Sequence, residues 1–244
     1  MIFSPEIQSY IRGERFSNAL KIPYSGKYTE QNRIELLLQI CNGKRILHIG
    51  CADHLPLIKQ KMEQGRWLHS LLCEVASECT GVDINADAVN YITQELKLSD
   101  VHYADITHEL PEALRERQWD VVVMGEILEH VDNPVGFLQA LKKQLQSRAT
   151  ELVITIPNSF NLLLMNDINS NTEDINSDHI YHFTPYTLGR VIYKSGFTLQ
   201  ELYFADRVAL PFPMKIANRL KKMLGITRRF TAKYFATLIV VTHF

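Results

Sequence analysis

Apolar runs of strand length recur along the chain and alternate with segments in which apolar residues have helical spacing. The clearest run is 119–124, whose three consecutive valines are typical of a strand buried on both faces. Six further runs predict strands, at 45–49, 80–84, 101–104, 152–156, 197–204 and 236–242. Because helical segments separate most of these runs, the pattern predicts an α/β fold in which helices cover both faces of one doubly wound, mostly parallel, seven-stranded sheet.

The helical segments carry start and stop signals. Thr29 and Asn85 are expected to cap two of them, because their side chains can accept a hydrogen bond from the first helical turn. The predicted helices are 29–41, 55–79 with a break near Gly65, 85–96, 134–146 and 184–194. No repeat or linker interrupts the pattern, so we expect one domain over 1–244, with 1–43 as an N-terminal helical cap and 166–178 as a mobile polar loop.

Charge is balanced overall but uneven along the chain. The formal net charge of −1 argues against a nucleic-acid partner, because such binding needs a broad basic surface. Seven Lys and Arg residues and no acids lie between Lys215 and Lys233, and apolar residues in 213–224 share one helical face. We therefore expect a basic helical insertion over 205–233. It is either a solvated helix over a substrate pocket or a contact for a membrane surface or a phosphate-bearing substrate.

The four cysteines and the start of the chain give expectations about compartment. Cys41, Cys51, Cys73 and Cys79 show no Cys-x-x-Cys spacing, which favours reduced thiols over zinc ligands. The first residues lack a signal-peptide pattern, and no apolar run is long enough to span a bilayer. These features predict a cytoplasmic protein.

Polar residues and a glycine stand at the carboxyl ends of four predicted strands. Gly50, Asp83, Asp105 and Glu126 follow or end the first, second, third and fourth strands in chain order. Open α/β sheets bind ligands at this edge, where a glycine permits close approach and a carboxylate accepts hydrogen bonds from ribose hydroxyls. Each signal is weak alone, since strand-end glycines and helix-capping acids are common. Together they predict a nucleoside cofactor.

The motifs around these strand ends follow the order found in one enzyme family. The most specific is Glu-Ile-Leu-Glu-His-Val-Asp-Asn-Pro at 126–134. Others lie at 47–51, 81–84, 104–106, 119–123, 154–158, 182–185 and 195–197. Over residues 30–204 the chain resembles the class I S-adenosylmethionine-dependent methyltransferases. It is most similar to the bacterial small-molecule group that includes the ubiquinone-pathway O-methyltransferases.

The resemblance implies S-adenosylmethionine as the cofactor and assigns residues to it. Asp83 would bind the ribose hydroxyls with Ile84 beside the adenine, and Asp105 would accept from the adenine amino group. Glu126 would face the methionine portion and the substrate. The full set of implied cofactor-binding residues is His48, Gly50, Cys51, Ala52, Asp83, Ile84, Asp105, Ile106 and Glu126.

The turn after the first strand departs from the family pattern. His48 stands where the family usually has an acid, and Cys51 and Ala52 follow Gly50 where a second glycine is usual. Asp53 and His54 are candidates to replace lost contacts to the methionine group. The alternative is a non-catalytic binding module of the same fold.

Three histidines and a glutamate are candidates for chemistry. An imidazole titrates near neutrality, so His130 or His182, and also His179, can take a proton from an acceptor hydroxyl. Each histidine is equally well explained as a residue that orders its loop, and Glu129 completes the catalytic set. No metal is expected. The less favoured alternative is a divalent ion on Glu126, Glu129 and His130 with His179 or His182, as in RNA 2′-O-methyltransferases with a related motif.

The expected function is therefore methyl transfer from S-adenosylmethionine to an oxygen of a small molecule. A sugar, a polysaccharide precursor or a specialised metabolite would suit the resemblance, in a monomer or homodimer without nucleic acid. The alternatives are the non-catalytic module and a metal-dependent RNA 2′-O-methyltransferase. Acceptor selection is expected in 1–30, 158–183 and 205–233, where periodicity says little.

Overall fold

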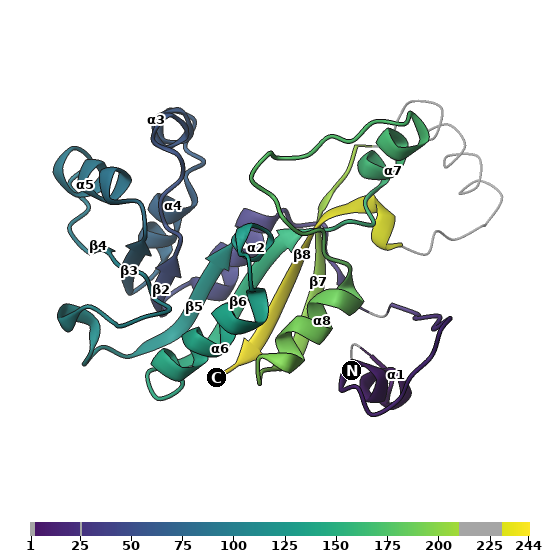
Figure 1. The fold of residues 1–244 in the computed structure, drawn as a ribbon. Coiled ribbons are helices and arrows are strands. Elements are labelled where there is room, and N and C mark those ends of the chain that lie inside the picture. Colours follow the sequence, from purple (N-terminus) through teal and green to yellow (C-terminus); the bar gives the residue numbers. More distant parts are fainter. Residues whose placement is uncertain (1–2, 25, 210–230) are drawn as a thin grey trace.

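One mixed sheet forms the centre of the molecule (Figure 1). The computed structural model describes residues 3–24, 26–209 and 231–244. Within these residues the sheet has eight strands in the order β1-β7-β8-β6-β5-β2-β3-β4, and only β8 runs antiparallel to its neighbours. The strands are β1 Lys27–Tyr28, β2 Arg45–Ile49, β3 Glu78–Asp83, β4 Val101–Tyr103, β5 Trp119–Gly125, β6 Ala149–Pro157, β7 Thr198–Arg207 and β8 Phe235–His243.

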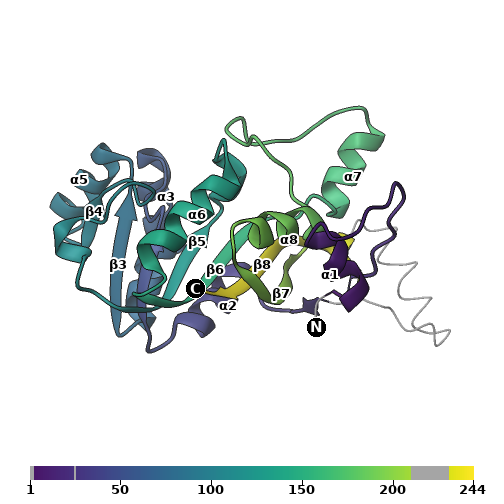
Figure 2. The same cartoon turned by 60° about the horizontal axis from the view of Figure 1, so that its bottom comes forward.

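Helices cover both faces of the sheet, as the sequence predicts. Helices α6 and α8 pack on one face and α2 and α4 on the other, and α3 packs with α5 near β4 (Figures 1 and 2). The described helices are α1 Pro5–Ile11, α2 Arg33–Cys41, α3 Leu55–Glu63, α4 Leu68–Val75, α5 Ala86–Gln94, α6 Pro134–Leu145, α7 Leu162–Asn169 and α8 Pro185–Lys194, with short 3₁₀ turns at Glu112–Leu114, Leu128–His130 and Ala232–Tyr234.

The central strand β5 explains why the two layers hold together. Val121 and Val123 pack against α2 and α4, whereas Val122 and Met124 pack against α6 and α8, and all four are fully buried. Successive side chains of a strand point to opposite faces, so an uninterrupted apolar run serves both layers at once. Because β2 and β6 run parallel to β5, all three strands end at the same edge of the sheet.

The α/β fold and its mostly parallel sheet are confirmed, but the strand count is wrong by one. The eighth strand is β1, which pairs with β7 through only two residues, Lys27 and Tyr28. Two residues cannot display the alternation by which a strand is recognised in a sequence. The expected helical cap at 1–43 therefore contains α1, an edge strand and α2 rather than helices alone.

Three local expectations also change. Asn32, not Thr29, caps α2, and its side chain forms a reciprocal capping box with Glu35. The segment 55–79 divides into α3 and α4, with the predicted break at Gly65, and ends in the first residues of β3. The polar loop expected at 166–178 begins inside α7, which rises beyond the carboxyl edge of the parallel strands (Figure 1).

The C-terminal insertion starts later than expected. Strand β7 continues to Arg207, so residues 205–207 belong to the sheet. The predicted basic helix at 213–224 lies outside the described residues. Among the residues described, no helix is both long and apolar enough to cross a membrane.

Asn158 joins the end of β6 to the start of β8. Its Nδ2 donates to the carbonyls of Ala232 and Phe235 at 2.9 and 2.8 Å, and its Oδ1 accepts from the backbone N–H of Phe160 at 3.1 Å. The side chain is fully buried. Three backbone groups therefore depend on one amide at the point where the antiparallel strand enters the sheet.

We expect Asn158→Ala to lower the free energy of unfolding by about 2–4 kcal/mol, since the buried backbone groups lose their partners. Urea denaturation followed by circular dichroism measures the change. Asn90→Ala, at an exposed position of α5, is the matched control and should shift stability by less than about 0.5 kcal/mol. Equal denaturation midpoints for the two variants would contradict the assignment.

Candidate active site

The turn after β2 is built around Gly50. Its φ of +67° lies in the left-handed region, and a Cβ there would stand 2.5 Å from Cδ1 of Ile127. The Gly50 N–H donates to the carbonyl of Val82 at 2.8 Å, and the Ala52 N–H donates to Oδ2 of Asp83 at 2.9 Å. The structure thus brings together the glycine turn and the strand-end acid that the sequence predicts to act together.

Asp83 is a buried carboxylate whose surroundings suit a polyhydroxyl ligand. It is 8% exposed, and its Oδ1 accepts from the backbone N–H of Asn85 at 2.9 Å. Burial raises the pKa of this carboxyl, against the effect of the backbone N–H groups that it accepts from. Each carboxylate oxygen keeps capacity for a further donor. Ile84 lies beside Asp83 and is 71% exposed. The pair offers an apolar surface for the base of a nucleoside next to an acceptor for its ribose hydroxyls.

Two other predicted cofactor residues have side chains that point into the interior. His48 and Cys51 are buried, and the Nδ1 of His48 lies 3.2 Å from the Nδ1 of His69 on α4. Burial also lowers the pKa of His48 well below its ordinary value. The geometry argues against cofactor contacts through these two side chains. It leaves the backbone of the turn for that role.

Asp105 and Ile106 follow β4, and their contacts are with the turn and the core next to them. Asp105 accepts from the hydroxyl and N–H of Thr107 at 2.6 and 2.9 Å and lies 2.9 Å from His108. The hydrogen bond from the Thr107 hydroxyl is the main reason that the pKa of Asp105 is lowered. Ile106 is part of the core. Contact of Asp105 with an adenine stays a prediction.

Glu126 follows β5 in a left-handed conformation, with φ +56°. Its N–H donates to the Thr155 carbonyl at 2.9 Å, and its Oε1 accepts from the Thr155 hydroxyl at 2.9 Å. Burial raises the pKa of Glu126, opposed by Arg33, whose Nη1 lies 3.6 Å away. A non-glycine residue rarely adopts this backbone conformation, so the packed surroundings must hold it there.

Sequence reasoning missed two residues of this edge, Arg33 and Asp206. Arg33 begins α2, and its backbone N–H donates to Oδ1 of Asp206 at 2.9 Å while its Nη1 donates to Thr155 at 3.3 Å. Nothing in the sequence marks Arg33. Asp206 lies near the carboxyl end of an apolar strand. It could have been predicted in the same way as Asp83, from an acid at a strand end.

Glu129 is fully buried, and neither carboxylate oxygen has a hydrogen-bond partner among the described residues. Burial, reinforced by the nearby charge of Glu126, raises its pKa to about 8. Its backbone carbonyl accepts from the N–H groups of Ile180 and Tyr181 at 2.8 and 3.2 Å. The 3₁₀ turn that carries Glu129 thereby holds the loop that carries the histidines.

The histidines divide into two places. His130 and His179 lie with ring centroids 4.6 Å apart at 82°, and ligand atoms of Glu129, His130 and His179 all fall within 4.8 Å of one another. His182 instead lies 3.4 Å from Glu173 and lines a cavity of about 630 Å³ under α7. His179 rather than His182 therefore joins His130 in one group.

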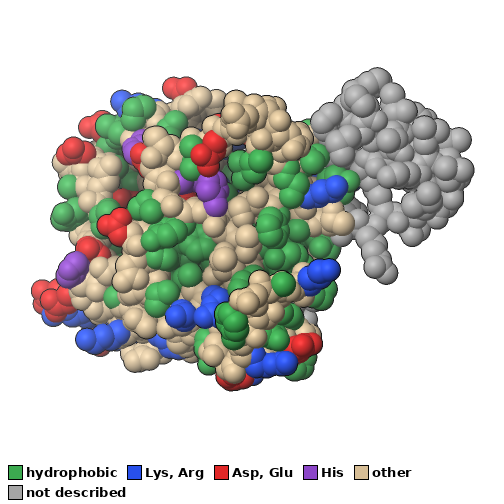
Figure 3. All heavy atoms as spheres, turned by 45° about the vertical axis from the view of Figure 1, so that its right-hand side comes forward, with side chains coloured by type: hydrophobic (Ala, Val, Ile, Leu, Met, Phe, Trp, Pro, Cys, Tyr) green, Lys and Arg blue, Asp and Glu red, His purple; other side chains and the backbone are tan. Residues whose placement is uncertain are grey.

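The glycine turn and the histidine loop also meet. Nε2 of His54 lies 3.5 Å from Oδ2 of Asp178, and the Nδ1 of His130 lies 3.0 Å from the carbonyl of the same Asp178. Figure 3 shows histidine side chains beside acidic ones in the upper part of the molecule, with hydrophobic side chains around them. The predicted cofactor side and the predicted chemical side thus share one edge of the sheet.

We expect Glu129→Gln to change stability with pH. The folded pKa of about 8 lies above the ordinary value of 4.5, so the buried carboxyl stabilises the fold below pH 4.5 and loses that contribution as the pH rises toward 8. The variant should match the native protein near pH 5 and exceed it near pH 9, by on the order of 1–4 kcal/mol.

Urea denaturation in the presence of a chelator measures this difference. Glu63→Gln, at an exposed position of α3, is the matched control and should show no such trend. A stability difference for Glu129→Gln that stays constant from acid to alkaline pH would contradict burial of an ionisable, unpartnered carboxyl.

Comparison with known proteins places this chain in a family. Residues 25–202 match the family model described as a methyltransferase domain. The ubiquinone biosynthesis O-methyltransferase of Psychrobacter arcticus is 25% identical over 169 residues, or 66% of this chain and 61% of that protein. The protein of the same description from Glaesserella parasuis is 27% identical over 122 residues, or 47% of this chain and 46% of that one. The chain thus matches less than two thirds of the length of these relatives.

Solved structures share the fold at low sequence identity. A SAM-dependent methyltransferase from Archaeoglobus fulgidus is 18% identical with a TM-score of 0.50, covering 86% of this chain and 94% of that one. The methyltransferase domain of a bacterial Hen1 protein is 16% identical with a TM-score of 0.54, covering 88% and 98%. Since the family model spans most of its length, the chain belongs to the methyltransferase domain family.

Proposed function

We propose that this chain transfers a methyl group from S-adenosylmethionine to an oxygen of a small-molecule acceptor. The observation that carries the proposal is the shared edge, where Asp83 and the Gly50 turn stand on one side and the His130 group on the other. Membership of the methyltransferase domain family supports the reaction, and the relatives described as ubiquinone biosynthesis O-methyltransferases support oxygen as the acceptor atom.

The nucleoside would lie on the ends of β3 and β4. Asp83 has carboxylate capacity for ribose hydroxyls, and exposed Ile84 offers an apolar surface for the adenine. When bound, S-adenosylmethionine supplies an electrophilic methyl group on a sulfonium that leaves as a neutral thioether. The chain then needs to position the acceptor in line with that methyl group and to remove the acceptor proton.

His130 is the proposed base. The carbonyl of Asp178 can only accept, so the contact at 3.0 Å fixes the proton of neutral His130 on Nδ1 and leaves the lone pair on Nε2. A hydroxyl proton would move to this Nε2. His182, at the cavity under α7, is the second candidate base, and Glu129 supports the His130 turn.

The acceptor would enter from α7 and the loop that follows it. Exposed apolar residues gather there, and polar groups line the same cavity as His182. Such a mixture suits a sugar, a polysaccharide precursor or a specialised metabolite with a ring and hydroxyl groups. Contact of 213–233 with a phosphate-bearing substrate or a membrane surface, a cytoplasmic location and a monomeric or dimeric state remain part of the proposal.

A metal-assisted version of the same transfer is the second candidate. The side chains of Glu129, His130 and His179 fit a divalent ion, because both oxygens of Glu129 are buried without a partner among the described residues. Such an ion would be held by these three residues and would lower the pKa of an acceptor hydroxyl. The net charge of −1 favours a small acceptor over RNA.

We expect Asp83→Asn to weaken binding of S-adenosylhomocysteine by roughly 10- to 100-fold, because it removes a charged acceptor of hydrogen bonds. Isothermal titration calorimetry measures the affinity. Asp120→Asn is the matched control: Asp120 also accepts hydrogen bonds from its neighbour strand, but through Arg45 at the opposite end of the sheet. It should keep native affinity. Absence of binding by the native protein at millimolar cofactor would contradict the proposed function itself.

We expect His130→Gln to lower kcat by roughly 10²- to 10⁴-fold on an acceptor found by screening sugars and phenols with methyl-labelled cofactor. Affinity for S-adenosylhomocysteine should not change. His182→Gln distinguishes the two candidate bases, because only the variant of the true base should lose kcat on this scale. A chelator should leave the rate intact if no metal takes part. If the chelator abolishes turnover and added Mg²⁺ or Mn²⁺ restores it, the result would favour the metal-assisted version.

A further inference from the structure

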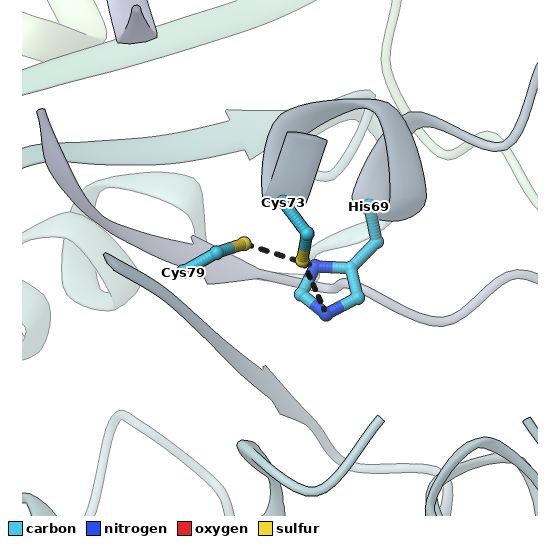
Figure 4. Close-up of side chains that lie close together, drawn as sticks. All are labelled: His69, Cys73 and Cys79. Atoms are coloured by element: carbon cyan, nitrogen blue, oxygen red, sulfur yellow. Dashed lines mark hydrogen bonds between the residues drawn. The ribbon is translucent and has the colours of Figure 1, made fainter. Parts of the chain in front are cut away.

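A second group of metal-ligating side chains lies on the face of the sheet that α4 covers. His69 and Cys73 belong to α4 and Cys79 to β3, and one ligand atom of each falls within 4.8 Å of the others (Figure 4). The Sγ of Cys79 is 3.8 Å from Nδ1 of His69, and the Sγ of Cys73 is 3.8 Å from Nε2 of the same ring. The proposed methyl transfer uses none of these residues.

Local structure explains why these side chains converge. His69 and Cys73 are four residues apart, which places them on one face of α4. Cys79 and Gly81 alternate onto the α4 side of β3. Gly81 leaves the necessary room, because a Cβ there would lie 2.8 Å from Sγ of Cys51 and 2.9 Å from Cε1 of His69.

A second imidazole, that of His48 on the neighbouring strand β2, lies against His69 beside the three-residue group. Its Nδ1 lies 3.2 Å from Nδ1 of His69, and the two side chains are 3% and 1% exposed. Nδ1 of His69 is thus the atom that both His48 and Cys79 approach.

We propose that His69, Cys73 and Cys79 bind Zn²⁺, with His48 as the fourth ligand. Two imidazoles and two thiolates are a common ligand set for structural zinc, with Zn–N near 2.0–2.1 Å and Zn–S near 2.3 Å. Tetrahedral ligand atoms are then separated by about 3.3–3.8 Å, close to the separations of 3.2 and 3.8 Å at Nδ1 of His69. The Sγ of Cys73, which lies 3.8 Å from Nε2 of the ring, would move toward Nδ1 on binding. Binding releases one proton from each thiol.

The charge balance favours this ion in an interior site. Two thiolates neutralise Zn²⁺, so the complex of four ligands is neutral and avoids the penalty of a buried net charge.

The proposed zinc ion would connect α4 to β2 and β3, next to the turn that carries Gly50. Its ligands come from three elements, and the spacing of 48, 69, 73 and 79 matches no short zinc motif. The sequence therefore favoured free thiols over zinc, whereas the folded chain gathers the donors. The four cysteines are all reduced in the structure.

Cobalt substitution tests the proposal in the full chain kept under a thiol-free reductant. Cobalt(II) bound by thiolates gives a sulfur-to-metal charge-transfer band and intense visible bands typical of tetrahedral geometry. We expect both at about one equivalent per chain, with displacement by Zn²⁺. Ions bound at Glu129, His130 and His179 would lack the sulfur band, and His179→Ala should leave that band intact.

Variants assign the ligands. Cys73→Ser and Cys79→Ser should abolish the sulfur-rich spectrum and weaken Zn²⁺ binding by more than roughly 100-fold in competition with a chromophoric chelator. Losing a group that only hydrogen-bonds to a metal ligand already weakens binding by about 10- to 100-fold. His48→Asn should weaken binding but keep the sulfur band. Cys41→Ser is the matched control, a buried thiol in the same layer on α2, and should behave as the native chain.

A thermal melt checks that each variant folds and adds a second measurement. Zn²⁺ should raise the melting temperature of the native chain and of Cys41→Ser but not that of Cys73→Ser. Absence of a sulfur band in the native protein, or its persistence in both Cys73→Ser and Cys79→Ser, overturns the proposal. So does isolation of a metal-free Cys73–Cys79 disulfide from reducing cells.

Discussion

The hydrogen bond from the Ala52 N–H to the Asp83 carboxylate is the interaction on which the functional edge depends. It holds the turn after β2 against the end of β3 at 2.9 Å, in a turn where Gly50 adopts a left-handed conformation and leaves no room for a Cβ beside Ile127. One carboxylate thus serves two purposes. It fixes the turn that would face the methionine group, and it retains the acceptor capacity that a ribose requires.

The opposite half of the edge depends on buried charge. Glu126 and Glu129 follow one strand, and Arg33 forms an ion pair with Glu126 at 3.6 Å, whereas the Glu129 oxygens have no hydrogen-bond partner among the described residues. Ionising an unpartnered carboxyl inside a protein is costly, and burial therefore raises the pKa of Glu129. Perturbed acids of this kind cluster at functional sites because chemistry needs groups that change state near neutral pH. The backbone carbonyl of Glu129 meanwhile orders the loop that brings His179 to His130.

Two faces of the same strands serve different purposes. Residues on the α6 and α8 side of β2 and β3 build the main core, whereas those on the α4 side include His48, Cys79 and Gly81. The absence of a side chain at Gly81 lets an imidazole lie on the sheet, where an apolar layer would otherwise be continuous. The turn that departs most from the family pattern is therefore also the one that rests on a polar interior.

The sequence by itself determined the described strands except β1, most helices and the strand-end acids Asp83, Asp105 and Glu126, because period-2 and period-3.6 patterns and capping residues act within a few neighbours. The run 119–124 and the cap Asn85 follow this rule. Only the tertiary structure decided that β1 joins the sheet, that Arg33 reaches Glu126, and that His179 rather than His182 accompanies His130. It also gathered His48, His69, Cys73 and Cys79. These contacts join residues far apart in the chain, and the crossing of β2, β3 and α4 that creates them leaves no periodic trace in the sequence.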